Sequence, residues 1–315
     1  RYCASLGWAM AHLPAHWDVI PAVPAAAYKE ATLATFDPAH SALAFETSGT
    51  TSGTGGRHFM ETRTLYDSAL LAGFERFVLG DGARLRYLNV VPNPADRPQS
   101  SLGYMMQQVS RHFGDGQTGW FVRDDALLVE AFIADTRAAA DDEAAACIAT
   151  TAFGLLNVLD ELERRDIELP LPPGSRIMET GGFKGRTRAI TREELYARAA
   201  AVFHLDVSSI VAEFGMTELT TQYYDAPASR GTAENRRKVS PPWLRSRVVG
   251  PDGKTLPDGT VGALVHVDLA NRSSCIAVAT EDLGVRFADG LVVIGRETGA
   301  SLRGCSLDAE TLLPR

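Results

Sequence analysis

The sequence has few cysteines, no long apolar run and no block of like charges. Its 315 residues include only four cysteines, and no pair of them has the CxxC spacing of a structural zinc site or a redox dithiol. No uninterrupted apolar run reaches the ~18 residues of a membrane-spanning helix. A chain of this length can bury a large core without such staples, so we expect reduced thiols in a cytoplasmic protein that has no membrane span.

The charge balance is acidic. The chain has 31 Lys and Arg residues against 39 Asp and Glu residues, which gives a formal net charge of −8. Proteins that bind nucleic acid neutralise phosphates with clustered Lys and Arg, so nucleic acid is not an expected partner. The chain starts at Arg1 without a signal-peptide pattern, and residues upstream of it can be missing.

Strand-like and helix-like segments alternate over the first 240 residues. Short apolar runs closed by turn residues predict strands at 87–91, 175–179 and 210–214. Helical patterns cover residues 64–79, 124–135 and 141–165, and Thr191 with Glu194 forms a capping box for a further helix that extends to about His204. This alternation predicts an α/β fold with a mostly parallel, helix-covered sheet and a ligand site at the carboxyl ends of its strands.

The pattern changes after residue 240. Turn residues at 250–253 and 257–259 separate strands predicted at 245–249 and 262–269, and a last hairpin is predicted at 287–294. These features predict an antiparallel β subdomain. The expected division is therefore an α/β core at 1–240, a β subdomain at 241–295 and a C-terminal remnant at 296–315.

The most informative segment is a run of glycine and hydroxyl residues at 47–56, followed by Arg57 and His58. Its ten positions contain only Ser, Thr and Gly. Glycines allow the backbone N–H groups to approach an anion, and the hydroxyl groups and Arg57 can bind phosphate oxygens. The spacing is neither a Walker P-loop nor a Rossmann fingerprint. We expect a phosphate-binding loop between a strand at 42–45 and a helix, and the alternative is a flexible linker.

This segment strongly resembles the phosphate loop of adenylate-forming enzymes, the superfamily of acyl-CoA synthetases, peptide-synthetase adenylation domains and luciferases. The family loop reads T-S-G-T-T-G-x-P-K. The matching residues here are Thr47, Ser48, Gly49, Thr50 and Thr51. The sequence then departs from the motif, and Arg57 stands where the family has Lys.

Two later segments match the same superfamily in the same order. Residues 214–218 (FGMTE) resemble its Y-G-x-T-E motif, and residues 280–284 (TEDLG) resemble T-G-D-L-G. The resemblance implies that Thr217 contacts the α-phosphate of ATP, that Glu218 helps to bind Mg²⁺ and that Asp282 binds the ribose hydroxyls. ATP and Mg²⁺ are therefore the expected cofactors.

The resemblance also points to a missing cation. Gly181 and Gly182 lie where the family has its glycine-rich turn beside adenine, and residues 295–304 contain the G-R and R-G pairs of its hinge. Acyl-CoA synthetases continue past the hinge into a lid domain with a catalytic Lys, whereas 20 residues follow Gly295 here and none is Lys. We expect the lid to be truncated or absent. Either the chain is then inactive, or another cation replaces the lysine, and the candidates are Lys184 and Arg186.

Within the superfamily, the chain looks like the acyl-protein synthetases, the fatty-acid-activating component of the bacterial luciferase fatty-acid reductase. The resemblance rests on residues 20–29, 181–185 and 303–306. Members of that family activate a fatty acid with ATP, hold the acyl group on a cysteine near their own C-terminus and pass it to a partner reductase. Cys305 is the matching cysteine, and the nearby Arg303 favours its thiolate.

Three functions are compatible with these residues. The first is acyl-protein synthesis, with a carboxylic acid as substrate and an acyl reductase or acyl carrier as partner. The second is an adenylate-forming ligase that transfers the acyl group to CoA, a carrier protein or an amine. The third is a non-catalytic subunit that binds a nucleotide or an acyl group. His58 is expected either to orient substrate or to be structural.

Overall fold

The computed structural model describes residues 7, 14–47, 55–181, 190–233 and 236–296. The chain forms two compact units that are discontinuous in sequence. The β-rich unit combines Arg1–Ala69, Met216–Thr221 and Lys238–Arg315, and the α/β unit combines Leu70–Gly215 and Gln222–Arg237. The sequence predicted a different kind of division, into consecutive segments that end at residues 240 and 295. That division stays a prediction.

The α/β unit is built on a sheet in the order β10-β9-β8-β7-β4-β5-β6. The strands are β4 (Leu85–Pro92), β5 (Gly114–Arg123), β6 (Ala126–Leu127), β7 (Ala146–Thr151), β8 (Arg176–Thr180), β9 (Ile210–Phe214) and β10 (Tyr223–Asp225). The five strands from β9 to β5 in this order pair in parallel, and β10 and β6 pair antiparallel with their neighbours at the ends. This arrangement confirms the mostly parallel sheet that was predicted from the sequence.

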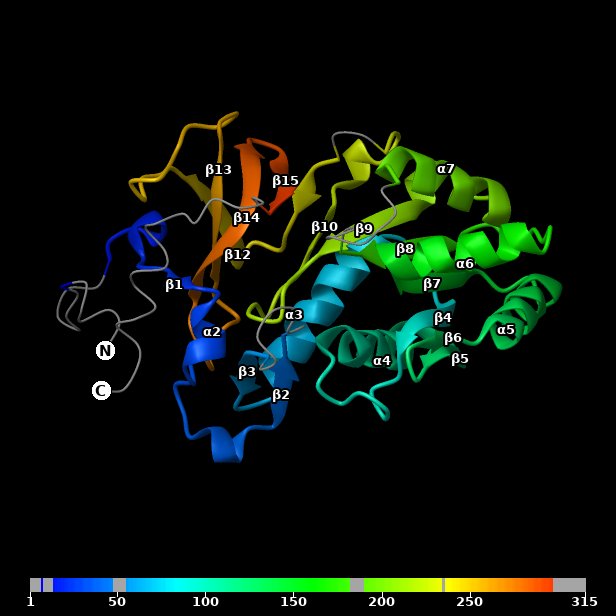
Figure 1. The fold of residues 1–315 in the computed structure, drawn as a ribbon, viewed down its shortest axis with the longest axis horizontal. Helices are drawn as coiled ribbons and strands as arrows, with labels where there is room; N and C mark the ends of the chain where they lie inside the picture. The colour runs from blue at the N-terminus through cyan, green and yellow to red at the C-terminus, as the bar shows by residue number, and fades with distance from the viewer. Residues whose placement is uncertain (1–6, 8–13, 48–54, 182–189, 234–235, 297–315) are drawn as a thin grey trace. The chain divides into compact units, whose positions relative to one another are not determined.

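Helices cover this sheet (Figure 1). They are α4 (Ser101–Phe113), α5 (Val129–Asp141), α6 (Ala152–Arg164) and α7 (Arg192–Phe203), and α3 (Thr64–Phe74) runs into a π-helical turn at Glu75–Leu79. The main core forms where α5, α6 and α7 pack on the strands, with Ile148 and Ile177 against Leu155, Leu159 and Phe203. Thr191 caps α7 as predicted, since its side chain accepts a hydrogen bond from the Glu194 amide at 3.1 Å.

The β-rich unit contains the antiparallel strands expected near the C-terminus. Their order is β12-β13-β14-β15-β11, and β1 pairs in parallel with β14. The strands are β1 (Val23–Pro24), β11 (Lys238–Val239), β12 (Leu244–Val249), β13 (Val261–Asp268), β14 (Ala277–Phe287) and β15 (Gly290–Arg296). A separate hairpin joins β2 (Leu43–Glu46) to β3 (Arg57–Met60).

Short helical segments complete both units. In the β-rich unit these are α2 (Ala27–Glu30) and 3₁₀ turns at Trp17–Val19 and Pro38–His40. In the α/β unit, 3₁₀ turns occur at Val207–Ser209 and Pro227–Ser229. Among the described residues, no helix is long and apolar enough to cross a membrane.

Three local predictions were wrong. The long helix expected at 141–165 is instead β7 followed by α6, because the apolar run ACIATT pairs on both sides with β4 and β8 and lies at the centre of the sheet. The helix expected at 124–135 begins only at Val129, after β6. The glycine-rich loop leads into β3 and not directly into a helix.

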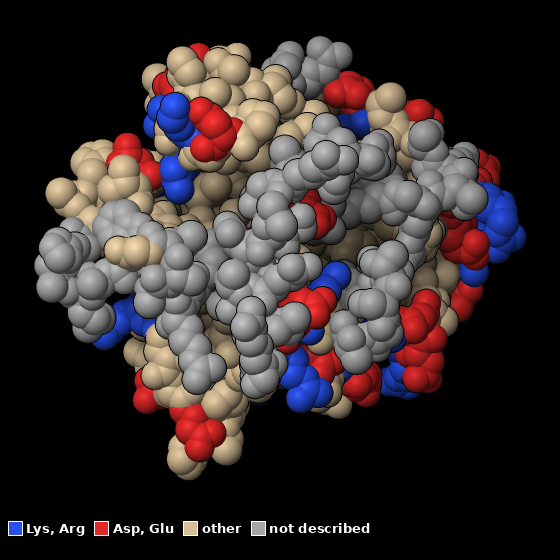
Figure 2. Space-filling model, turned by 60° about the vertical axis from the view of Figure 1, so that its left-hand side comes forward, with Lys and Arg blue, Asp and Glu red and all other residues tan. Residues whose placement is uncertain are grey.

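Charged side chains of both signs are mixed on the surface. On the face shown in Figure 2, Lys and Arg lie among Asp and Glu. Some surface charges form local ion pairs, as in the contacts of Glu161 with Arg164 at 2.6 Å and with Arg165 at 2.8 Å. Such exposed pairs contribute little to stability.

Candidate functional site

The base of the glycine-rich loop is a tight hairpin closure in the β-rich unit. The Thr47 amide donates to the Gly56 carbonyl at 2.8 Å, and the Gly56 amide donates to Thr47 Oγ1 at 2.8 Å. A Cβ atom at Gly55 would lie 2.7 Å from the Thr47 carbonyl oxygen, and one at Gly56 would lie 2.7 Å from the Tyr28 carbonyl oxygen. Only glycine fits these two positions without movement of the backbone. The predicted residues Ser48, Gly49, Thr50 and Thr51 lie outside the described residues.

Arg57 lies at the exit of the loop on β3. Its guanidinium group contacts the Glu46 carboxylate on β2 at 2.9 Å, and 61% of its side chain is exposed. A surface pair of this kind is weak and exchanges readily with solvent or another anion. In this contact Nε and Nη2 of Arg57 meet one Glu46 oxygen, and the role of Arg57 as a phosphate ligand stays a prediction.

The turn that contains Thr217 and Glu218 belongs to the same unit. His58 Nδ1 lies 2.7 Å from the Thr217 carbonyl oxygen, and Asn271 Nδ2 donates to the Glu218 carbonyl oxygen at 2.8 Å. Glu218 is largely buried, with 9% of its surface exposed. Both backbone carbonyls of the candidate motif are therefore fixed by side chains from distant parts of the chain.

A buried carboxylate holds the end of this turn. Asp268 is fully buried at the end of β13 and accepts hydrogen bonds from the amides of Thr220 at 3.0 Å and Thr221 at 2.8 Å. It also accepts from Thr221 Oγ1 at 2.9 Å and from the Ala270 amide at 3.0 Å. Burial raises the pKa of Asp268, while these donors act in the opposite direction.

Asp282 lies on β14, also in the β-rich unit. It is 5% exposed, and its amide donates to Thr280 Oγ1 at 3.2 Å. The backbone of Asp282 faces Arg296 of β15 in the ladder, next to a β-bulge at residues 283–284. Bulges change the direction of side chains and are frequent beside binding sites. The ribose-binding role of Asp282 stays a prediction.

The glycine turn expected beside adenine follows β8 in the α/β unit. Gly181 has a φ of 86°, a left-handed conformation that favours glycine. The residue before it, Thr180, donates a hydrogen bond to the Glu213 carboxylate at the end of β9. Two adjacent parallel strands are thus joined at their carboxyl ends. Gly182 and Lys184 lie outside the described residues.

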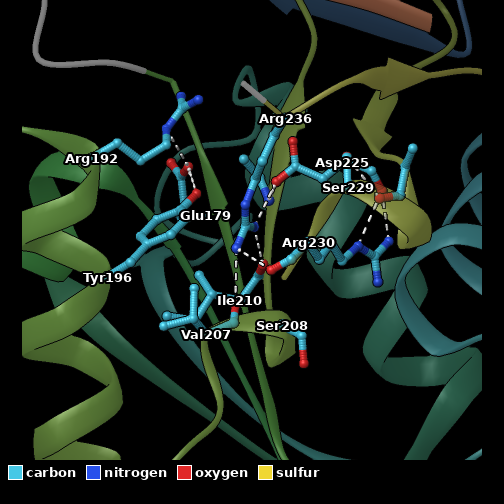
Figure 3. A network of polar contacts seen from close by, with 12 residues as sticks. Glu179, Arg192, Tyr196, Val207, Ser208, Ile210, Asp225, Ser229, Arg230 and Arg236 are labelled. Carbon is cyan, nitrogen blue, oxygen red and sulfur yellow. Dashed lines mark hydrogen bonds and ion pairs between the residues drawn. The ribbon is translucent and has the colours of Figure 1, made fainter. Parts of the chain in front are cut away.

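A buried polar network supports β8 and β9 from the side of α7 (Figure 3). Asp225 accepts hydrogen bonds from Arg236 Nη1 at 2.9 Å and from the Ala212 amide at 2.9 Å, and both side chains of the ion pair are fully buried. The Arg236 guanidinium lies 4.7 Å from the centre of the Tyr196 ring. Tyr196 in turn donates to Glu179 Oε1 at 2.7 Å. The network fixes the strand that ends directly before Gly215.

The structure therefore places five of the predicted residues in the β-rich unit and one in the α/β unit. The β-rich unit contains Thr47, Arg57, Thr217, Glu218 and Asp282, and the α/β unit contains Gly181. The predicted acyl acceptor Cys305 lies outside the described residues. The sequence did not identify Asn271 or Asp268, although Asp268 could have been noticed as a carboxylate at the end of a mostly apolar strand.

Glu218 is a described carboxylate whose chemistry fits a magnesium ion that is bound together with nucleotide phosphates. Among the residues that the structure describes, no group of three or more His, Cys, Asp or Glu residues could hold a metal ion. Glu218 offers one largely buried carboxylate. Mg²⁺ is commonly held by one or two carboxylates together with substrate phosphates and water, and this donor set fits that mode.

Comparison with known proteins agrees with the predicted resemblance. The chain is 23% identical over 276 residues to the long-chain-fatty-acid–luciferin-component ligase of Aliivibrio fischeri, which covers 85% of this chain and 69% of that protein. No model of a known protein family matches.

Solved structures share the fold. The structure of McyG A-PCP complexed with phenylalanyl-adenylate matches with a TM-score of 0.58 and 17% identity, over 85% of this chain and 43% of that one. ATP-bound MatB from Rhodopseudomonas palustris matches with a TM-score of 0.55 and 14% identity, over 81% of this chain and 48% of that one. The chain thus spans about half the length of these structures. The predicted fold, that of adenylate-forming enzymes, is confirmed.

Proposed function

We propose that this chain activates a carboxylic acid with ATP and forms an acyl-adenylate. One observation carries the proposal: within one compact unit, the base of a Ser/Thr/Gly loop is linked to the Thr217-Glu218 turn by His58, with His58 Nδ1 2.7 Å from the Thr217 carbonyl oxygen. These are the two segments that resemble the phosphate-binding motifs of adenylate-forming enzymes. The shared fold and the ligase relative support the same reaction class.

The chemistry explains why these residue types are needed. A carboxylate and ATP are both anions, so their negative charge must be offset before the carboxylate attacks the α-phosphorus. In our proposal, the loop amides and hydroxyls and Arg57 bind phosphate oxygens, while Thr217 orients the α-phosphate. Mg²⁺, when bound with ATP at Glu218, would supply further positive charge to the phosphates. Asp282 would hold the ribose, and Gly181 and Gly182 would leave room for adenine.

The more specific part of the proposal concerns the acid and the acceptor. We infer a fatty acid as substrate, and Cys305 as the residue that receives the acyl group before it passes to an acyl reductase or an acyl carrier. In this step the Cys305 thiolate attacks the acyl carbonyl, a thioester forms and AMP leaves. The support is the likeness to the luciferin-component ligase. Lys184 is proposed to help offset the negative charge of the carboxylate and ATP.

The experiment that tests adenylate formation is pyrophosphate release with ATP, Mg²⁺ and a panel of carboxylic acids. The full chain should release pyrophosphate with at least one acid. Glu218→Gln keeps the side-chain shape but removes its charge, and we expect the rate to fall by roughly 10²–10³. Glu30→Gln, an exposed residue on α2 of the same unit, is the matched control and should leave the rate unchanged. No release with any acid would favour a non-catalytic binding subunit.

The acceptor is tested separately with the acid that supports release. A radiolabelled acid should give a hydroxylamine-labile label on the protein, and peptide mapping should locate it at Cys305. Pyrophosphate release that depends on added CoA, a carrier protein or an amine, without labelling of the protein, would identify the chain as an ordinary adenylate-forming ligase.

A further inference from the structure

His58 lies between the two segments of the proposed phosphate site. It is two residues after Gly56, which closes the base of the glycine-rich loop, and its ring nitrogen contacts the Thr217 carbonyl 159 residues further along the chain. We propose that His58 is a positioning residue: its Nδ1–H group sets the distance between the loop base and the Thr217-Glu218 turn. This inference rests on the proposed function of that site.

The surroundings of His58 hold its ring in one orientation. The side chain is fully buried, and the Tyr28 ring packs edge-on against it with 5.7 Å between ring centres. Tyr28 is itself fixed, because its hydroxyl lies 2.9 Å from Ser274 Oγ and its carbonyl oxygen lies against Gly56. A ring that is packed in this way transmits a displacement of the loop base directly to the turn.

The contact also determines which tautomer His58 adopts. A backbone carbonyl only accepts hydrogen bonds, so Nδ1 must carry the proton that is donated to Thr217. Burial lowers the pKa of His58, whereas the Thr217 carbonyl and the Asn271 side chain act in the opposite direction. The ring is therefore neutral near pH 7, and its one N–H donor, at Nδ1, is bound to the Thr217 carbonyl oxygen. A neutral ring still has the one N–H donor that the contact with the Thr217 carbonyl requires.

The turn has further attachments besides the His58 contact. Asn271 holds the Glu218 carbonyl, and Asp268 holds the amides of Thr220 and Thr221. Loss of the His58 contact should therefore release the Thr217 carbonyl locally while the rest of the turn remains in place. The expected consequence is a loss of ATP affinity and adenylation rate that exceeds the loss of stability.

Two near-isosteric substitutions test this role. In His58→Asn the side-chain amide nitrogen can take the place of Nδ1, whereas in His58→Gln the amide is one carbon further from the backbone. We expect His58→Asn to bind ATP within about threefold of the native protein and His58→Gln to bind it roughly tenfold to a hundredfold more weakly. Affinity is measured by calorimetry with ATP and Mg²⁺, and stability by thermal unfolding.

His266 offers a matched control. It is also fully buried in the β-rich unit, and its Nδ1 lies 2.8 Å from Ser246 Oγ on β12. His266→Gln should reduce stability and leave ATP affinity unchanged. The positioning role would be overturned if His58→Asn and His58→Gln bound ATP with equal affinity. It would also be overturned if His266→Gln lost ATP affinity in proportion to its loss of stability.

The readouts separate this inference from the function on which it rests. If the native chain binds ATP but releases no pyrophosphate with any acid, adenylation is wrong, and the affinity series still decides the role of His58. If the native chain releases pyrophosphate and both His58 variants bind ATP as it does, adenylation stands and the positioning role is wrong. If the native chain does not bind ATP, both are wrong.

Discussion

Asp282 is the residue whose proposed contact can be removed most cleanly. Its side chain is largely buried on β14, and its expected partners are the two ribose hydroxyls of ATP. Asp282→Ala should weaken ATP binding by roughly 1.5–3 kcal/mol, the range for hydrogen bonds to a charged group. Calorimetric titration measures the loss. A 2′,3′-dideoxy analogue that binds the native chain as tightly as ATP would contradict the assignment.

The buried His266 makes a prediction about acid stability. Burial lowers its pKa to about 4, whereas an unfolded histidine has a pKa near 6.5. Between these values the unfolded chain binds more protons than the folded one. The contribution of the buried, neutral His266 to the free energy of unfolding is therefore fully present above about pH 6.5, and it is lost as the pH falls toward about 4. The loss amounts to roughly 3 kcal/mol.

Denaturant unfolding at several pH values checks this prediction. The native chain should lose stability between pH 6.5 and 4, and His266→Gln should lose less over the same interval. His58 remains in both proteins and contributes equally to their pH dependence. Parallel curves for the two proteins would show that His266 is not buried in its neutral form.

At the scale of single elements, the loop base depends on Gly56. A methyl group there would lie 2.7 Å from the Tyr28 carbonyl oxygen, which belongs to backbone and cannot rotate away. Gly56→Ala should therefore displace β3 and the entrance to the loop, with a loss of roughly 1–3 kcal/mol in stability. Gly82→Ala, on an exposed turn with no atom near the added methyl group, is a control for an added side chain, although its positive φ adds some strain.

The same scale shows what the sequence could and could not predict. The strand at Ile210–Phe214 was predicted at its observed bounds, since a short apolar run ends there at a glycine turn. Residues 146–151 were predicted as part of a long helix because their run of Ala, Cys, Ile and Thr shows no alternation of apolar and polar residues that would indicate a strand. Only pairing with β4 and β8 on both sides makes it a strand, and pairing is not visible in the local sequence.

The residues of the candidate site also differ in whether the local sequence points to them. Thr47, Thr217 and Glu218 were proposed from local motifs, because phosphate binding requires particular residue types at fixed spacing, and their roles stay predictions. The roles of Asn271 and Asp268 were missed, because these residues act through hydrogen bonds to backbone atoms about 50 residues earlier in the chain. Their residue types alone carry no signal of such contacts.

At the scale of the whole molecule, the stability of the α/β unit depends on the buried Arg236–Asp225 pair. Arg236 also donates to the carbonyl oxygens of Val207 at 3.0 Å and Thr232 at 2.6 Å, so it joins several segments of the unit. Arg236→Met would leave Asp225 as an uncompensated buried charge, and we expect a loss of about 3–5 kcal/mol. Amide hydrogen exchange should accelerate in β9 of the α/β unit far more than in β13 of the β-rich unit. Equal acceleration in both strands would contradict this assignment.

The discontinuity of the β-rich unit has a consequence for synthesis on the ribosome. Strand β1 pairs with β14, and Val23 can therefore form its backbone pairing only after Val278 has been synthesised. The long segment Leu70–Gly215, in contrast, contains nearly all of its own sheet and is complete much earlier. Long-range pairing of this kind slows folding. Strand β1 must therefore remain unpaired on the nascent chain until β14 has been synthesised, and this part of the chain is a natural target of chaperones, whereas the β2–β3 hairpin can form early because both of its strands lie within residues 43–60.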